Sequence, residues 1–257
     1  MKKSQLSFEN FSNKAKLYAK YRPSYSEKYI YYLSLMGIDK SSIIADIGAG
    51  TGIHSKLLAN IAQKVYCVEP NEEMAAECSS LKLEFPNIEI YNSTGENTLL
   101  PDNCLDYVMI AQAFHMLDQH KCKIEFQRIL KQRGKVVLTW NSKSHDTLLF
   151  KDTEEVLHRY CSDYNRELNA PKLTPYTYED FFKDGIYDFL YFKDDYSEFL
   201  DENMFIGRTL SASYSLTEHD VQYKNYVIAL REIFQKHNVD NLIKISLNTT
   251  IYFGSLS

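Results

Sequence analysis

Apolar-rich runs of strand length alternate with stretches of helical period through the middle of the chain. Strand-like runs cover residues 42–47, 65–68, 88–91, 105–111 and 135–140. Apolar residues recur at helical spacing over residues 53–62, 72–81 and 118–131. This alternation predicts βαβ units, and therefore an α/β fold whose parallel sheet is covered by helices on both faces. Gly134 is expected to end the third helix.

The two flanks of this region have weaker periodicity. Pro23 separates two short helices expected before the first strand, over residues 13–22 and 24–37, and Ser24 to Glu27 has the form of a capping box. Beyond residue 141, helices are expected over 143–184, 198–212 and 217–237, with β-prone runs at 186–192 and 243–253. The sequence therefore predicts an α/β core with a helical cap built from both ends of the chain.

Composition narrows the class of protein. The 257 residues are 44% hydrophobic and 25% charged, as in a globular protein, which excludes disorder, collagen and coiled coil for the whole chain. A net charge of −5 predicts no general attraction to nucleic acid or anionic membranes. The chain shows neither a signal peptide nor an apolar stretch of about 20 residues, so we expect a cytoplasmic protein. Five cysteines without a CxxC pair indicate reduced thiols and no metal site.

The clearest chemical signal is a glycine cluster between a predicted strand and a predicted helix, running from Asp46 to Gly52 with the sequence DIGAGTG. Glycines allow a tight turn and the close approach of a ligand to the main chain. Exposed N–H groups at the start of a helix favour a polar or anionic ligand. A dinucleotide fingerprint requires its third glycine at position 53, which is Ile53 here. The GxGxG pattern therefore disfavours a nicotinamide cofactor.

A carboxylate follows the second predicted strand. Glu69 lies 21 residues after Gly48 and directly before Pro70. An acidic side chain at this place can accept hydrogen bonds from both hydroxyls of a ribose. An isolated glutamate is more often a solvated loop residue. Its separation from the glycine cluster favours the ribose interpretation.

These motifs together resemble the class I S-adenosylmethionine (SAM) dependent methyltransferases. The resemblance continues through Ser93–Glu96, Leu100–Asn103, Leu105-Asp106 and Ala111–His115, which are similar to the type 11 group and its trans-aconitate methyltransferase-like branch. Arg22-Pro23 and residues 207–214 also resemble that branch. The resemblance implies a doubly wound, mostly parallel, seven-stranded Rossmann-like sheet with a helical cap. It divides one domain into an N-terminal cap or lid (1–40), a SAM-binding core (41–142), and cap insertions with the last strands (143–257).

The resemblance also implies a set of SAM-binding residues. The loop beneath the methionine part would comprise Asp46, Gly48, Ala49, Gly50, Thr51 and Gly52. The ribose and adenine would lie against Glu69, Pro70, Asn71, Met74, Thr94, Gly95 and Glu96. Gln112 and Ala113 would follow the fourth strand, and Tyr21 and Arg22 would reach the SAM carboxylate. Thr94 stands where many relatives carry Asp, so a charged contact to the adenine amine is not expected.

The acceptor side is less clearly marked. His115 follows the fourth strand and suits a proton acceptor, although a packing role is equally compatible with its position. Trp140 and Asn141 end the fifth strand and are expected to form a pocket wall. Arg208 and Tyr214 are candidates for binding a carboxylate, or for an ordinary charged helix face. Tyr18 and Tyr25 complete the expected substrate-binding set.

The leading functional hypothesis is transfer of a methyl group from SAM to a small molecule, with S-adenosylhomocysteine (SAH) as product. A carboxylate acceptor fits, because it needs no base. Two alternatives share these motifs: an NAD-type oxidoreductase, and a SAM-binding regulatory protein without catalysis. A nucleic-acid substrate is not expected, because the chain is acidic and lacks an Asn-Pro-Pro-Tyr-like tetrapeptide after the fourth strand. The motifs specify neither the acceptor nor the oligomeric state.

Overall fold

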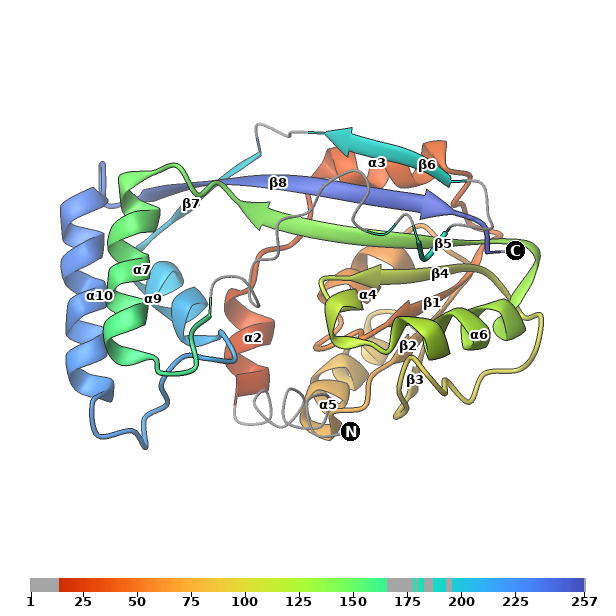
Figure 1. Cartoon of the computed structure of the whole chain (residues 1–257), viewed down its shortest axis with the longest axis horizontal. Coiled ribbons are helices and arrows are strands. Elements are labelled where there is room, and N and C mark those ends of the chain that lie inside the picture. Colours follow the sequence, from red (N-terminus) through yellow and green to blue (C-terminus); the bar gives the residue numbers. More distant parts are fainter. Residues whose placement is uncertain (1–13, 166–177, 179, 183–186, 193–195, 257) are drawn as a thin grey trace.

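The computed structural model of the chain describes residues 14–165, 178, 180–182, 187–192 and 196–256. Its centre is a mixed sheet in which seven strands follow one another in the order β3-β2-β1-β4-β5-β8-β6, while β7 pairs with the first part of β8 (Figure 1). The strands are β1 (Ile43–Ile47), β2 (Lys64–Val68), β3 (Ile88–Tyr91), β4 (Leu105–Ala111), β5 (Leu130–Lys143), β6 (Tyr187–Phe192), β7 (Ser197–Leu200) and β8 (Ile243–Gly254).

The first five strands pair in parallel, and β8 runs antiparallel to its neighbours β5, β6 and β7. The predicted α/β class and the mostly parallel, seven-stranded order are confirmed, with β7 as a short addition. In open sheets of this kind, ligands bind beyond the carboxyl ends of the parallel strands, where the strand order reverses. Here that point lies between β1 and β4.

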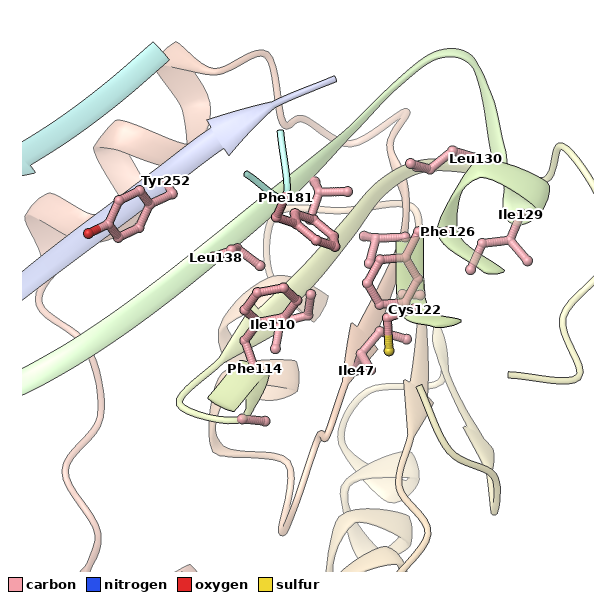
Figure 2. Close-up of a cluster of buried hydrophobic side chains, with 14 of the residues drawn as sticks. Ile47, Ile110, Phe114, Cys122, Phe126, Ile129, Leu130, Leu138, Phe181 and Tyr252 are labelled. Atoms are coloured by element: carbon pink, nitrogen blue, oxygen red, sulfur yellow. The ribbon is translucent and has the colours of Figure 1, made fainter. Parts of the chain in front are cut away.

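Helices cover both faces of the sheet, as the alternating pattern predicts. On one face, α6 (Gln119–Ile129) buries Cys122, Phe126 and Ile129 against the sheet residues Ile110 and Leu138, together with Phe181 (Figure 2). On the other face lie α3 (Glu27–Leu35), α4 (Ile53–Ala59) and α5 (Glu72–Ser80). Burial of each large apolar side chain contributes about 1.5–3 kcal/mol to the stability of the fold. The two packed layers therefore fix the position of β1, from which the glycine loop extends.

A third apolar cluster lies away from the parallel half of the sheet. It is formed by α7 (Leu148–Tyr160), α9 (Glu202–Leu210) and α10 (Tyr223–His237), together with the start of β8. The long strands β5 and β8 extend to these helices, and α2 (Ala15–Tyr21) lies between them and the parallel strands (Figure 1). Helix α2 contacts both α9 and α5. A helix from the N-terminal part of the chain thus lies against a helix from its C-terminal part.

Three local expectations are wrong. Helix α6 ends at Ile129 and β5 begins at once with Leu130, whose pairing with Leu105 leaves Gly134 inside the strand instead of at a helix end. The N-cap of α3 is Ser26, because residue 24 is still in the extended segment after Pro23.

The third wrong expectation concerns the region beyond β5. Residues 197–200 form strand β7 instead of the start of a helix, because they pair with β8. Of the helix expected over 143–184, the structure has α7 alone: Lys143 belongs to β5, residues 161–165 are not helical, and part of the stretch lies outside the described residues. The β-prone runs are confirmed as β6 and β8. Among the described helices, none is sufficiently long and apolar to cross a membrane.

Candidate functional site

The loop after β1 is shaped by three glycines in the left-handed region, with φ values of +68° at Gly48, +58° at Gly50 and +85° at Gly52. The N–H groups of Gly48 and Ala49 donate to the carbonyl of Val68, at 2.8 and 3.2 Å. A Cβ on Gly48 would lie 2.6 Å from the Cβ of Ala113, whereas a Cβ on Gly50 would meet nothing within 4 Å. Gly50 therefore presents open main chain to a ligand.

Glu69 ties this loop to the loop that follows β2. Its two carboxylate oxygens accept from the N–H of Gly50 at 2.8 Å and the N–H of Asn71 at 2.9 Å. The side chain is 6% exposed, and this burial raises the pKa of its carboxyl group, while the two N–H donors oppose the shift. Each carboxylate oxygen retains a free lone pair. Glu69 can therefore accept further hydrogen bonds from a pair of hydroxyl groups.

Two cavities meet at the glycine loop. The smaller, of about 70 Å³, is lined by eleven of the expected site residues: Tyr18, Gly48, Gly50, Glu69, Pro70, Asn71, Met74, Thr94, Gly95, Gln112 and Ala113. The larger, of about 540 Å³, is lined by Tyr18, Arg22, Tyr25, Asp46, Gly48, Ala49, Gly50, Gln112, His115, Trp140, Asn141, Arg208 and Tyr214 among the expected residues. Tyr18, Gly48, Gly50, Ala111, Gln112 and Met116 line both.

Four expected residues line neither cavity. The carbonyl of Tyr21 accepts from Arg208 Nε at 3.0 Å, and its ring lies against Gly207. Thr51 is buried, and its hydroxyl has no hydrogen-bond partner within the described part of the chain. Gly52 caps α4, and Glu96 accepts from the N–H of Asp118 at 2.9 Å. A contact of these four with SAM stays a prediction.

A series of buried, hydrogen-bonded polar side chains connects the glycine loop to the elements around it. Asp46 accepts from the hydroxyl of Ser55 at 2.6 Å and lies 2.9 Å from His54 Nδ1. The Nε2 of His54 lies 2.8 Å from the hydroxyl of Tyr29, which lies 3.1 Å from the hydroxyl of Thr139. This series connects the glycine loop, α4, α3 and β5. His54 was not among the residues expected from the sequence, although it follows Gly52, the last glycine of the motif, by only two positions.

Gln112 and Asn141 hold the carboxyl ends of β4 and β5 together. Gln112 has a φ of +63°, and its side-chain amide donates to the carbonyl of Asn141 at 3.0 Å. Asn141 in turn donates to the carbonyl of Ser24 at 3.2 Å. A non-glycine residue in this region is strained, and such strain clusters at ligand sites. His115 faces the larger cavity, and burial lowers the pKa of its imidazole.

The two arginines expected at the site differ in their partners. Arg208 is buried, forms an ion pair with Glu198 on β7, and donates to the carbonyl of Tyr21. The guanidinium of Arg22 lies 4.8 Å from the ring centre of Tyr18, and its Nε is buried without a partner among the described residues. The charge of Arg208 is therefore compensated within the protein, whereas Arg22 has no carboxylate partner among the residues that the structure describes.

The remaining expected residues form aromatic walls. Trp140 stacks on Tyr178 with ring centres 4.8 Å apart, and its indole N–H lacks a partner in the part of the chain that the structure describes. Tyr25 stacks on Tyr29 at 4.6 Å. Burial raises the pKa of Tyr214, which keeps its hydroxyl neutral.

Much of the larger cavity wall was not expected from the sequence. The missed residues come from the end of β5, from α7, from α9 and from the start of β8, and include Ser142, Lys143, His145, Thr147, Phe150, Glu154, Phe205, Lys244 and Ser246. The described residues contain no group of three or more His, Cys, Asp or Glu side chains placed to hold a metal ion.

Comparison with known proteins agrees with this geometry. Residues 45–138 match the family model described as "Methyltransferase domain". An uncharacterised methyltransferase-like protein of Schizosaccharomyces pombe is 31% identical over 127 residues, which cover 49% of this chain and 48% of that protein. The chain thus spans about half the length of this relative.

Solved structures share the fold across most of the chain. A structure from Anaeromyxobacter dehalogenans, provisionally named a type II methyltransferase, has a TM-score of 0.62 at 18% identity, covering 91% of this chain and 98% of that one. The phosphoethanolamine N-methyltransferase 2 of Haemonchus contortus, solved in complex with phosphomonomethylethanolamine and SAH, has a TM-score of 0.54 at 17% identity, covering 95% of this chain and 57% of that one. The sequence match and the strand order agree on a Rossmann-like methyltransferase fold.

Proposed function

We propose that this chain is a SAM-dependent methyltransferase that acts on a small molecule, with SAM bound in the smaller cavity and the acceptor in the larger one. The observation that carries the proposal is the junction of the two cavities. Gly48, Gly50 and Gln112 line both, so a ligand that fills the smaller cavity would have one end at the wall of the larger.

The residues around the smaller cavity fit SAM. Glu69 has free lone pairs for two ribose hydroxyls, and Asn71 and Met74 begin the helix beside it. The open space at Gly50 suits the methionine part, and the unpaired Nε of Arg22 suits its carboxylate. NAD is disfavoured, because Ile53 replaces the third glycine of its fingerprint.

Catalysis requires little covalent chemistry from the protein. When bound, SAM supplies an activated methyl group, whose transfer depends mainly on in-line alignment of the acceptor. Gln112 and Asn141, joined by a hydrogen bond, form a fixed wall at the place of transfer. A carboxylate acceptor, implied by the resemblance to the trans-aconitate methyltransferase-like branch, needs no base. For a hydroxyl or amine acceptor, His115 would take the proton, since its lowered pKa favours neutral imidazole at pH 7.

We also propose that the helices outside the parallel sheet form a cap that closes over the acceptor. Residues of α2, α7 and α9 line the larger cavity together with the ends of β4 and β5. Tyr18 of the N-terminal helix lines both cavities, Arg22 lines the larger one, and Asn141 holds the following segment in place. Such a cap would exclude water from the transfer reaction.

The first test is ligand binding. By isothermal calorimetry the purified full chain should bind SAM and SAH, and should not bind NAD. Tight binding of NAD alone would overturn the proposal. A regulatory protein without catalysis would bind SAM equally well, so the second measurement is the release of SAH from SAM with a panel of small acceptors. Release that depends on the presence of one acceptor identifies an enzyme.

Two glycines of the loop provide a matched pair of variants. A methyl group at Gly50 points into open space, so Gly50→Ala should weaken SAH binding at a stability cost of about 1 kcal/mol from its left-handed backbone. A methyl group at Gly52 would lie 2.5 Å from Leu81 Cδ1 and 2.8 Å from Cys78 Sγ, so Gly52→Ala should cost about 2 kcal/mol or more. Urea unfolding and calorimetry on both variants separate the two effects. Equal SAH affinity of Gly50→Ala and the natural chain would place the ligand elsewhere.

A further inference from the structure

Asp46 places a buried carboxylate at the start of the glycine loop. Its side chain is 1% exposed, and it lines the larger cavity beside Gly48 and Gly50. In the part of the chain that the structure describes, no lysine or arginine lies within ion-pair distance of this carboxylate; its partners are the hydroxyl of Ser55 and the imidazole of His54. Each carboxylate oxygen thus accepts one hydrogen bond within the protein and keeps a lone pair for a ligand.

His54 fixes the orientation of this carboxylate, because both of its ring nitrogens are held. Nδ1 lies 2.9 Å from Oδ1 of Asp46, and Nε2 lies 2.8 Å from the hydroxyl of Tyr29. An ionised carboxylate only accepts, so Nδ1 carries the proton and donates to Asp46. Burial raises the pKa of Tyr29, so its hydroxyl keeps a proton to donate to Nε2, and its oxygen accepts from Thr139 at 3.1 Å. A neutral imidazole therefore satisfies every member of the series.

The packing around His54 also restricts its movement. The residue lies in the first turn of α4, and its side chain is 5% exposed although it lines the larger cavity. The centre of its ring lies 5.4 Å from that of Tyr25 and 5.8 Å from that of Tyr29. A side chain locked by packing and by two hydrogen bonds can hold a neighbouring group in one geometry.

The chemistry of SAM requires such a carboxylate. Its methionine end carries an ammonium and a carboxylate on one carbon atom, and in the function proposed above Arg22 binds the carboxylate. The ammonium group then needs an anionic partner in the same cavity. Among the described residues, the acidic side chains in the cavity wall are Asp46 and Glu154. Glu154 lies on α7 of the third apolar cluster, where it accepts from Tyr164 at 3.0 Å. Asp46, at the glycine loop, is therefore the partner that fits.

We propose that His54 is a positioning residue for SAM, which holds the carboxylate of Asp46 in the orientation that binds the ammonium group of the methionine part. The inference rests on the proposed function, because it takes SAM as the ligand of the glycine loop. It goes beyond the GxGxG pattern, which does not specify position 54. An apolar side chain at this position would leave Oδ1 of Asp46 without its donor.

The test combines one change in the protein with one change in the ligand, measured by calorimetry on the full chain at pH 7. The ligands are SAH and deamino-SAH, in which hydrogen replaces the α-amino group. The natural chain should bind SAH about 10-fold to 100-fold more tightly than deamino-SAH, the range for a hydrogen bond to a charged group. His54→Phe should remove most of this preference by weakening SAH binding, while the affinity for deamino-SAH stays the same.

Two further substitutions separate the roles of the two ring nitrogens and retain part of the hydrogen bonding if His54→Phe fails to fold. The amide group of asparagine reaches the place of Nδ1, and that of glutamine reaches the place of Nε2. His54→Asn should therefore keep the donor to Asp46 and the preference for SAH. His54→Gln should keep a partner for Tyr29 and lose the preference. The control His120→Phe makes the same change at an exposed position of α6, outside both cavities, and should have no effect.

The outcomes distinguish a positioning role from a structural one. Equal weakening of SAH and deamino-SAH by His54→Phe would show that the histidine only supports the fold, and would overturn the inference. Equal affinity of the natural chain for the two ligands would also overturn it, because no group would then recognise the ammonium. A preference kept by His54→Gln and lost by His54→Asn would assign the effect to Tyr29 and contradict the role of Asp46. Failure of both ligands to bind the natural chain would overturn the proposed function instead.

Discussion

Replacing Glu69 with alanine should weaken SAH binding by about 10-fold to 100-fold, the range expected for losing hydrogen bonds to a charged group. Two effects combine in this variant. The ribose hydroxyls lose their acceptor, and the N–H groups of Gly50 and Asn71 lose the carboxylate that positions both loops. Calorimetry with SAH measures the change directly. An unchanged affinity in a folded variant would show that Glu69 does not hold the ribose.

Glu89→Ala is the matched control for Glu69→Ala. Glu89 lies on β3, pairs with Lys64 at 2.7 Å and lines neither cavity, so its loss should leave SAH affinity unchanged. Glutamine is a poor substitute at position 69, because its NH₂ group would face one of the two N–H donors.

The pH dependence of SAH binding provides a second check on Glu69. Burial raises the pKa of this carboxyl group, so the carboxylate is lost at a higher pH than that of an ordinary glutamate. SAH affinity of the natural chain should therefore fall on acidification earlier than an exposed carboxylate would predict. The same titration of Glu69→Ala should lack that step.

The parts of the fold and site that could be predicted depend on neighbours in sequence. The strand from residue 43 to 47, the glycine loop and α4 follow from a run of fewer than twenty residues. The place of Glu69 follows equally from its distance to that loop. Both kinds of signal are local, and the parallel sheet then brings the two loops to the same edge.

The parts that could not be predicted depend on contacts between distant segments. Lys143 and His145 fall in a stretch that the sequence pattern assigned to a helix, and they reach the cavity because β5 continues past the end of β4 in pairing with β8. Gly134 looked like a helix end, because nothing nearby indicates that Leu130 pairs with Leu105. The wall of the larger cavity is therefore built from tertiary pairing.

Arg208 illustrates the same limit, because its residue type fits two roles. As a surface-facing arginine near a tyrosine it resembles a carboxylate-binding residue. In the folded chain it packs between β7 and the end of α2, where Glu198 and the carbonyl of Tyr21 occupy its guanidinium. Its partner Glu198 lies on a strand that the sequence pattern assigned to a helix. A carboxylate-binding role and a structural role of Arg208 predict different outcomes for Arg208→Met.

We expect Arg208→Met to lower the free energy of unfolding by about 3–5 kcal/mol, because it removes one partner of a buried ion pair and leaves the other charge without compensation. The side chains of Arg208 and Glu198 are 4% and 15% exposed, so water cannot readily replace the missing partner. Urea unfolding followed by circular dichroism measures the change. Arg231→Met is the control. The side chain of Arg231 is 59% exposed, so its ion pair with Glu202 contributes less than about 1 kcal/mol to the free energy of unfolding.

A second substitution separates the loss of the pair from the loss of packing. If the cost of Arg208→Met arises from the unpaired carboxylate, the double variant Arg208→Met with Glu198→Gln should recover much of the lost stability. A double variant as unstable as the single one would assign the cost to packing against Tyr21 and Gly207. A single variant that keeps its stability would contradict this structural role and would restore Arg208 as a candidate for binding the acceptor.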